Sequence, residues 1–297
     1  MVWFLSSLAV VMLVGFALVG ISTYVGWQLT HPKRKSVDES PETYGLDEQV
    51  VHFNSLDGGV RLDGWFFRSN AANRQEPLTV IMSHGYAGTR LEKGLPALAL
   101  AKSIVAAGYH VLMFDFRNSG QSEGRLTTVG YLEKQDVLGA IRWVQTHIGG
   151  KISLLGFSMG GTTSLLAAAD EPSVRGVITD SAFSQLHPYL QDNLPVWSKL
   201  PRLPFTPLIL TILPNLIGIN PRRVDALAAV DRIYPRPILF IHSQSDNAIP
   251  WSNSEAMWRK HPDVFELWIT EQGLHVGSYQ KQPEAYTERV LAFLSKL

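Results

Sequence analysis

The chain has 297 residues, of which 45% are hydrophobic, and its 26 basic side chains balance 26 acidic ones. This length is enough for one large packed domain with an appendage. The balanced charge creates no overall field that would attract nucleic acid, so no nucleic-acid partner is expected. The sequence has no cysteine, which excludes disulfides, thiolate chemistry and cysteine-ligated zinc.

The first 32 residues contain no Asp, Glu, Lys or Arg. An apolar run of this length can cross a bilayer as a helix, and we expect a transmembrane anchor over residues 1–29. The alternative is a cleaved signal peptide, which normally has a basic start, a short apolar core and an A-x-A-like cleavage site. This run has no basic start, a long apolar core and no clear site of that kind, which favours an uncleaved, single-pass anchor in the cell membrane.

Lys33, Arg34 and Lys35 directly follow this run. The positive-inside rule then places the following domain in the cytoplasm; an exported, tethered domain is the alternative. The next stretch is polar, with Pro41 near its centre. Residues 30–48 are therefore the expected linker to a domain over residues 49–297.

From residue 49 the chain alternates between strand-like and helix-like patterns. Two strand-like runs, 50–53 and 60–67, flank Asp57-Gly58-Gly59, a strong hairpin turn. Alternation of this kind predicts a mostly parallel sheet with helices on both faces, whose ligands bind beyond the carboxyl ends of the strands. Further strands are expected at 79–82, 110–114, 151–155, 174–179, 237–241 and 265–269, and helices at 96–107, 131–147, 161–170 and 283–297.

Residues 156–160 read Gly-Phe-Ser-Met-Gly, a G-x-S-x-G motif between an expected strand and an expected helix. This context predicts a nucleophile elbow, which lifts the hydroxyl of Ser158 out of the sheet on a sharp turn. Gly156 and Gly160 are needed because larger residues there would collide with the neighbouring backbone. The alternative is a serine that only caps the helix.

A serine hydroxyl needs a base within hydrogen-bond reach to act as a nucleophile. His275 follows the last expected strand and is the candidate base. Asp246 follows the strand 237–241 and is the candidate acid that orients the imidazole, with Asp180 as the second choice. A surface-loop histidine and a turn-forming aspartate are the alternatives. The chain order Ser158, Asp246, His275 decides, because one hydrolase class has this order.

The loop 83–89 directly follows a strand, and its glycines let the backbone curl toward the nucleophile. The amides of Tyr86 and Met159 are the expected donors of an oxyanion hole. His84 is expected to hold the loop through hydrogen bonds rather than to take part in chemistry. The sequence has no HExxH pair, carboxylate cluster or P-loop fingerprint, so no metal or cofactor site is expected.

Together these features resemble the α/β-hydrolase superfamily over residues 50–297. Within it, the chain is similar to the membrane-anchored serine hydrolases of the Bem46 and ABHD13-like type and to the serine-aminopeptidase-like hydrolases. The resemblance implies an eight-stranded α/β-hydrolase sheet, a triad of Ser158, His275 and Asp246, and an oxyanion hole from Tyr86 and Met159. It implies no particular substrate. The features that carry it are the His84-Gly85 turn, the loop from Asp115 to Ser122, Gly-Phe-Ser-Met-Gly, Asp246 and His275.

Residues 183–225 interrupt the alternation and contain seven prolines, which argue against long straight helices. We expect this insertion to be a helical cap over the active site. A sharper interpretation has its apolar face touch the bilayer and admit acyl chains, although the uncharged run 205–219 is too short and too proline-broken to span a membrane. Trp197, Phe205 and Leu208 are the expected lining of the substrate pocket.

The chain is therefore expected to be a membrane-tethered serine esterase acting on carboxylic esters or thioesters of apolar acyl groups, lipids included, through an acyl-enzyme and without a cofactor. Cleavage of peptides or amides is the second interpretation, and it ranks lower because no acidic cluster is evident for a free amino terminus. An acyltransferase on the same fold is a further alternative. A non-catalytic membrane scaffold is the third class, and the complete Ser, His and Asp set argues against it.

Overall fold

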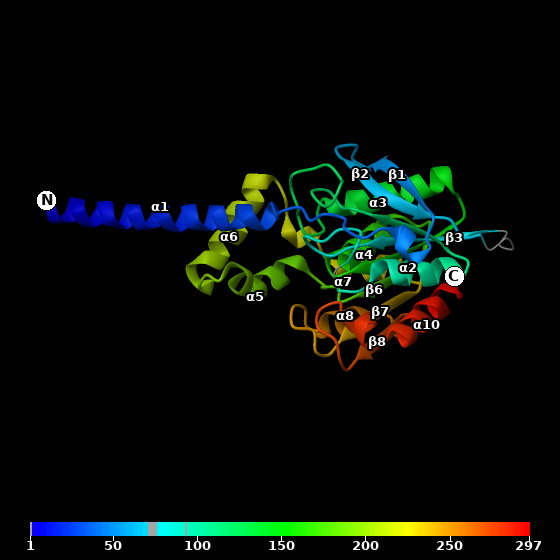
Figure 1. The fold of residues 1–297 in the computed structure, drawn as a ribbon. Coiled ribbons are helices and arrows are strands. Elements are labelled where there is room, and N and C mark those ends of the chain that lie inside the picture. The colour runs from blue at the N-terminus through cyan, green and yellow to red at the C-terminus, as the bar shows by residue number, and fades with distance from the viewer. Residues whose placement is uncertain (1, 71–75, 93) are drawn as a thin grey trace.

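A mixed sheet forms the centre of the domain in the computed structural model, which describes residues 2–70, 76–92 and 94–297 (Figure 1). Its strands are β1 (Glu48–Asn54), β2 (Arg61–Phe67), β3 (Leu78–Ser83), β4 (His110–Phe114), β5 (Lys151–Phe157), β6 (Val174–Asp180), β7 (Ile238–Ser243) and β8 (Glu266–Thr270). The described residues form one eight-stranded sheet in the order β1-β2-β4-β3-β5-β6-β7-β8. Only β1 with β2 and β2 with β4 pair antiparallel; β3 to β8 are parallel.

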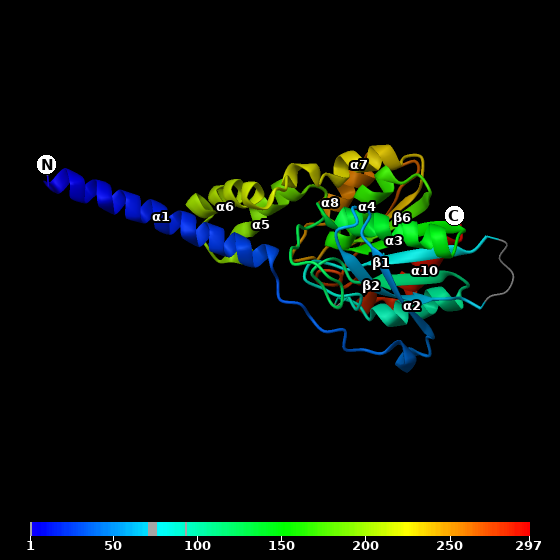
Figure 2. The ribbon, with the colours of Figure 1, turned by 90° about the horizontal axis from the view of Figure 1, so that it is seen from above.

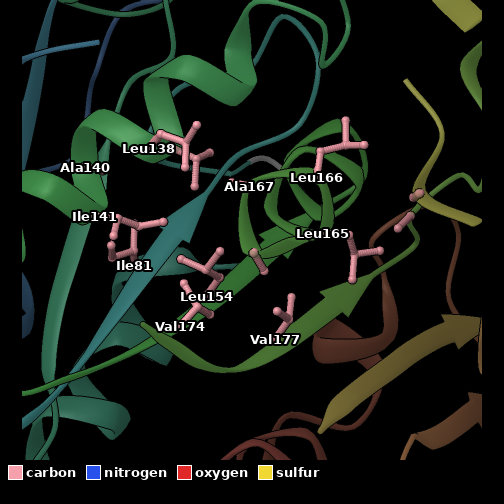
Figure 3. Packing of buried hydrophobic residues seen from close by; sticks show 14 of the residues in the cluster. Ile81, Leu138, Ala140, Ile141, Leu154, Leu165, Leu166, Ala167, Val174 and Val177 are labelled. Atoms are coloured by element: carbon pink, nitrogen blue, oxygen red, sulfur yellow. The ribbon is translucent and has the colours of Figure 1, made fainter. Parts of the chain in front are cut away.

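Helices cover both faces of this sheet (Figure 2). One face carries α3 (Glu133–His147), α4 (Met159–Asp170), α7 (Ala226–Ile233) and α8 (Ser252–Trp258). The other carries α2 (Ala97–Ala106), α9 (Ser278–Lys281) and α10 (Pro283–Leu294). Figure 3 shows the first of these two cores, where side chains of α3 and α4 lie against the central strands.

The predicted architecture is confirmed: an α/β-hydrolase sheet of eight mostly parallel strands with helices on both faces. The strand β4 begins and ends where the sequence predicts. The prediction omitted α7, α8 and α9, which are short. Asp225 caps α7 by accepting a hydrogen bond from the Ala228 amide, a start signal that the sequence does contain.

The insertion forms two helices, α5 (Leu186–Ser198) and α6 (Arg202–Ile217), bent by 120° relative to each other. Two short 3₁₀ helices lie elsewhere, at Pro41–Tyr44 before β1 and at Pro221–Arg223 before α7. The prolines shape these helices without preventing them, since α6 runs for 16 residues with Pro207 and Pro214 inside it. The first turn of α6 is interrupted at Leu203, whose ψ of 135° is not helical. Leu203 directly precedes a proline, and the α conformation is disfavoured for a residue in that position.

The first helix, α1 (Val2–Thr30), extends away from the domain on the same side as α5 and α6 (Figures 1 and 2). By length and composition it is a candidate membrane span. The chain that follows is docked on the domain. The amide of Thr127 donates to the Thr30 carbonyl over 2.8 Å, and the Arg34 guanidinium donates to the Gly124 carbonyl.

Candidate active site

The G-x-S-x-G segment forms the turn between β5 and α4. Ser158 has φ 52° and ψ −118°, a conformation that is strained for any residue with a side chain. A Cβ added to Gly156 would lie 2.3 Å from the Gly160 carbonyl oxygen, and one added to Gly160 would lie 2.1 Å from the Ser83 carbonyl oxygen. Only glycine fits at both positions, and the turn leaves Ser158 at the carboxyl end of β5.

The structure brings Ser158, His275 and Asp246 together from three separate loops. The Ser158 Oγ lies 2.8 Å from His275 Nε2, and His275 Nδ1 lies 2.9 Å from Asp246 Oδ2. An ionised carboxylate can only accept, so Nδ1 carries the ring proton and Nε2 is left to accept from the serine hydroxyl. This arrangement can draw the proton from Ser158 as the oxygen attacks.

The carboxylate of Asp246 is held by more than His275. Its side chain is 0% exposed, and Oδ1 accepts hydrogen bonds from the amides of Ala248 and Ile249. The buried ring of His242 lies 3.3 Å from Oδ2 through its Nε2. Burial alone would raise the pKa of Asp246, but the hydrogen bonds from His242 and His275 outweigh it and hold the pKa well below its usual range.

His275 is tuned by the same pairing. Burial of the ring would lower its pKa, but the hydrogen bond and charge of Asp246, with smaller contributions from Asp180 and Glu92, raise the pKa above its ordinary value. An imidazolium would therefore be stabilised in this position, next to the Ser158 hydroxyl.

Asp180, the second choice for the acid, has other partners. Its oxygens accept from the Ser181 hydroxyl at 2.9 Å and from the Tyr286 hydroxyl at 3.0 Å. Burial raises its pKa to about 6 against these hydrogen bonds. It lies at the end of β6 without a hydrogen bond to His275 among the described contacts, so the geometry favours Asp246.

An open cavity of about 640 Å³ lies over Ser158 and His275. Trp197 lines it, as the sequence predicts. A second, narrower apolar cavity adjoins it, and Phe205 and Leu208 line neither of the two. The helical phase of α6 explains the difference, because the buried side chains of α6 are Thr206, Ile209 and Leu213, spaced three or four residues apart. The remaining lining residues with side chains include Leu29, Tyr86, Glu92, Val129, Met159, Phe183, Tyr189, Ala248 and Val276.

Tyr86 and Met159 both line this cavity beside Ser158. Met159 is the first residue of α4, so its amide has no acceptor within its own helix. The loop that carries Tyr86 is fixed from two sides. The Gly85 amide donates to the Glu92 carboxylate, and the Tyr86 hydroxyl donates to the Leu29 carbonyl at the end of α1. Burial raises the pKa of Tyr86 to about 12, so this hydroxyl keeps its proton.

His84 holds the same loop, as the sequence predicts. Its Nδ1 lies 2.7 Å from the Gly85 carbonyl and must donate to it, while Nε2 accepts from the Phe116 amide at 3.0 Å. Burial lowers the pKa of His84, which keeps the ring neutral in this role. Both ring nitrogens are thus engaged away from Ser158.

Asp115 and Arg117 are paired, though not with each other. Asp115 forms a buried ion pair with Arg90 at 2.6 Å, and Arg117 pairs with Asp136 at 2.7 Å. These pairs fix the loop between β4 and α3. Over residues 2–70, 76–92 and 94–297, no group of three or more His, Asp or Glu side chains is arranged to hold a metal ion.

A sequence model of the alpha/beta hydrolase fold matches residues 79–204. The protein YqkD of Bacillus subtilis is 32% identical over 261 residues, which cover 86% of this chain and 78% of YqkD. The chain belongs to the α/β-hydrolase family.

Two further relatives of this α/β hydrolase carry descriptive names. The esterase Pf2001 of Pyrococcus furiosus has the same fold, with a TM-score of 0.74 at 24% identity, covering 90% of this chain and 98% of that one. The lysophosphatidylserine lipase ABHD12 of Danio rerio is 27% identical over 190 residues, which cover 60% of this chain and 46% of the relative.

Three residues near the site were not singled out from the sequence of this hydrolase. His242 contacts Asp246, Glu92 accepts a hydrogen bond from Gly85 in the loop that carries Tyr86, and Leu29 reaches the cavity from α1. His242 directly follows the predicted strand 237–241, four residues before Asp246, and this position was the available signal. Glu92 and Leu29 had none, because only the folded chain brings them to Ser158.

Proposed function

We propose that this α/β hydrolase is a membrane-tethered serine esterase that cleaves carboxylic ester or thioester bonds of apolar acyl substrates. The observation that carries the proposal is the hydrogen-bonded chain Ser158–His275–Asp246 at the floor of a largely apolar cavity. The names of two relatives, an esterase and a lysophospholipid lipase, support the same chemistry.

Ser158 is the nucleophile and His275 the general base. As the Ser158 Oγ attacks the carbonyl carbon, His275 Nε2 takes its proton, and the carbonyl oxygen becomes an oxyanion. The tetrahedral intermediate then collapses. The bond to the leaving alcohol or thiol breaks, and His275 gives its proton to that group, which leaves the acyl group on Ser158.

Water completes the cycle. His275 removes a proton from a water molecule as its oxygen attacks the acyl-enzyme, and the second tetrahedral intermediate releases the carboxylic acid while Ser158 regains a proton. Asp246 keeps the imidazole in the required tautomer and stabilises its cation. We assign the amides of Tyr86 and Met159 to the oxyanion, because they flank Ser158 on the loop after β3 and at the start of α4.

The proposed organisation is an anchor over residues 1–29, a linker over 30–48 and a hydrolase domain over 49–297 with a cap at about 183–225. Contacts between the end of α1 and the domain support a retained anchor rather than a cleaved signal, since Leu29 lines the cavity and accepts a hydrogen bond from Tyr86. The basic residues Lys33, Arg34 and Lys35 favour a cytoplasmic domain. Removal of the domain by protease added outside intact cells would contradict this orientation.

The function is tested with the full chain in detergent micelles. We expect hydrolysis of p-nitrophenyl esters and labelling of Ser158 by a fluorophosphonate, located by mass spectrometry of the modified peptide. Labelling without ester turnover would favour amide cleavage or acyl transfer over ester hydrolysis as the function. A folded protein that shows neither would support the scaffold interpretation instead.

The pH dependence of kcat/KM should show the state of His275. The base must be neutral to accept the serine proton, so activity rises with pH through the His275 pKa, and we expect that inflection above the ordinary value of 6.5. Asp246 remains ionised throughout this range because its pKa is held low. An initial-rate profile from pH 5 to 9 checks this, and an acid limb centred well below 6.5 would contradict the assigned pairing.

A further inference from the structure

The cap hairpin, defined here as α5 and α6, exposes apolar side chains at its tip. Val196 is 71% and Leu203 is 74% exposed, and residues 205–219 carry no charge. Large apolar side chains grouped on one surface are unfavourable in water and mark a contact with another apolar phase. The hairpin lies beside α1 in both overall views (Figures 1 and 2). Because α1 is a candidate membrane span, the lipid bilayer is the apolar phase that this position suggests.

The position of the hairpin relative to α1 is set by close helix packing. Ser22, Gly26 and Thr30, four residues apart along α1, are all buried. A Cβ added to Gly26 would lie 3.2 Å from Leu213 of α6. Small residues at this spacing allow helices to approach closely within membranes. If α1 spans a bilayer, the hairpin is therefore held at the level of the domain-side end of α1.

The sequence of α1 places that end at the membrane surface. Its 29 residues give a length of about 43 Å, more than the hydrocarbon core of about 30 Å. Trp3 near one end and Tyr24 and Trp27 near the other are exposed, as aromatic residues at the two interfaces are. Lys199 and Arg202 at the hairpin tip are also exposed, and their long side chains can reach lipid phosphates from a shallow position.

A narrow apolar cavity of about 50 Å³ lies between α1, α5 and α6. Leu29, Tyr86, Val129 and Trp197 line both this cavity and the larger one over Ser158, so the two adjoin. The cap side of the narrow cavity is lined by Leu190, Leu194, Ile209, Leu210 and Leu213. An almost entirely apolar lining beside the cavity over Ser158 suits part of an acyl chain.

We propose that the cap hairpin is immersed in the outer part of the same leaflet as the domain-side end of α1, and that the gap between them admits the acyl chain of a bilayer lipid ester to Ser158. This inference rests on the proposed esterase function and specifies its substrate class. The substrate is a long-chain lipid ester that reaches the site sideways from the membrane rather than from water.

Immersion is tested by fluorescence, independently of activity. The chain has no cysteine, so Leu203→Cys and Val50→Cys can each be labelled with a single environment-sensitive fluorophore in the full chain. Val50 is the matched control, 56% exposed on β1. In vesicles of phosphatidylcholine and phosphatidylglycerol, lipid spin-labelled near its headgroup should quench the Leu203 position at least about threefold more than the Val50 position. Equal quenching at both positions would overturn the proposal.

Substrate access is tested with two esters. Monooleoylglycerol is supplied in the same vesicles, and p-nitrophenyl acetate is supplied in water. The double variant Val196→Asp, Leu203→Asp should hydrolyse monooleoylglycerol at least about tenfold more slowly and p-nitrophenyl acetate within about twofold of the wild-type rate. Val50→Asp should change neither rate.

The outcomes separate the two proposals. If the wild type hydrolyses p-nitrophenyl acetate through Ser158 but the double variant loses nothing on vesicles, the leaflet route is wrong and the esterase stands. The leaflet route is also wrong if both esters are lost equally in a folded variant. If the folded wild type hydrolyses neither ester and Ser158 is not labelled by fluorophosphonate, the proposed function itself fails, and the leaflet route fails with it.

Discussion

Replacing Ser158 with alanine is expected to lower kcat for ester hydrolysis by about 10³-fold or more, with the fold unchanged. In the proposed mechanism the hydroxyl forms the new bond to the acyl carbon, and among the described contacts it is the Ser158 Oγ that hydrogen-bonds to His275 Nε2. Any remaining rate would come from water attacking a substrate bound near the oxyanion donors. Initial rates on p-nitrophenyl butyrate, with the full chain in micelles, measure the effect.

Ser164 provides the matched control. It lies on the same helix, α4, and its buried Oγ has no hydrogen-bond partner among the residues that the structure describes. Ser164→Ala should therefore leave both kcat and the melting temperature nearly unchanged or raise stability slightly. A Ser158→Ala variant that retains near-normal turnover would refute the mechanism. Equal losses in both variants would point to damage of the helix rather than to loss of a nucleophile.

Local patterns were enough to predict most of the fold and to single out three side chains that the structure brings together. A short apolar run followed by Gly156 and Gly160 already contains the steric reason for the turn at Ser158. A Cβ added to either glycine would lie less than 3 Å from a backbone atom. Asp246 and His275 could be chosen because parallel strands bring their carboxyl ends to one edge of the sheet. In the structure Asp246 is hydrogen-bonded to His275, and His275 is hydrogen-bonded to Ser158.

The walls of the cavity could not be predicted in the same way. Which face of α6 points inward depends on the break at Leu203 and on packing against α1, and neither is a local property of the sequence. The sequence therefore predicts Phe205 and Leu208 as pocket lining, whereas Ile209 and Leu213 line the apolar cavity. Leu29 lies more than fifty residues from Tyr86 along the chain, yet the two are hydrogen-bonded; a pattern read along the chain has no means to find such a contact.

Replacing Gly160 with alanine should cause the largest loss of stability of any single methyl group added near the site. The new Cβ would lie 2.1 Å from the Ser83 carbonyl oxygen and 2.5 Å from the His84 carbonyl oxygen. Both are backbone atoms, one in the last residue of β3 and one in the residue that follows it, so relief requires β3 and α4 to separate. We expect a loss of about 4 kcal/mol or more in the free energy of unfolding, and a fall on the order of 10 °C in melting temperature.

Gly59→Ala is the comparison that isolates the steric cause. A Cβ there would lie 3.6 Å from Asp57 Oδ1, an ordinary contact, so its melting temperature should stay within about 2 °C of the wild type. Circular dichroism of the full chain on heating measures both variants. If Gly160→Ala melts like Gly59→Ala, the loop carrying Ser83 and His84 can yield, and close packing against β3 is not what holds Ser158 in its strained turn. If it melts far lower, that packing sustains the strain at Ser158, and Ser158 and the loop that carries Tyr86 are held as one unit.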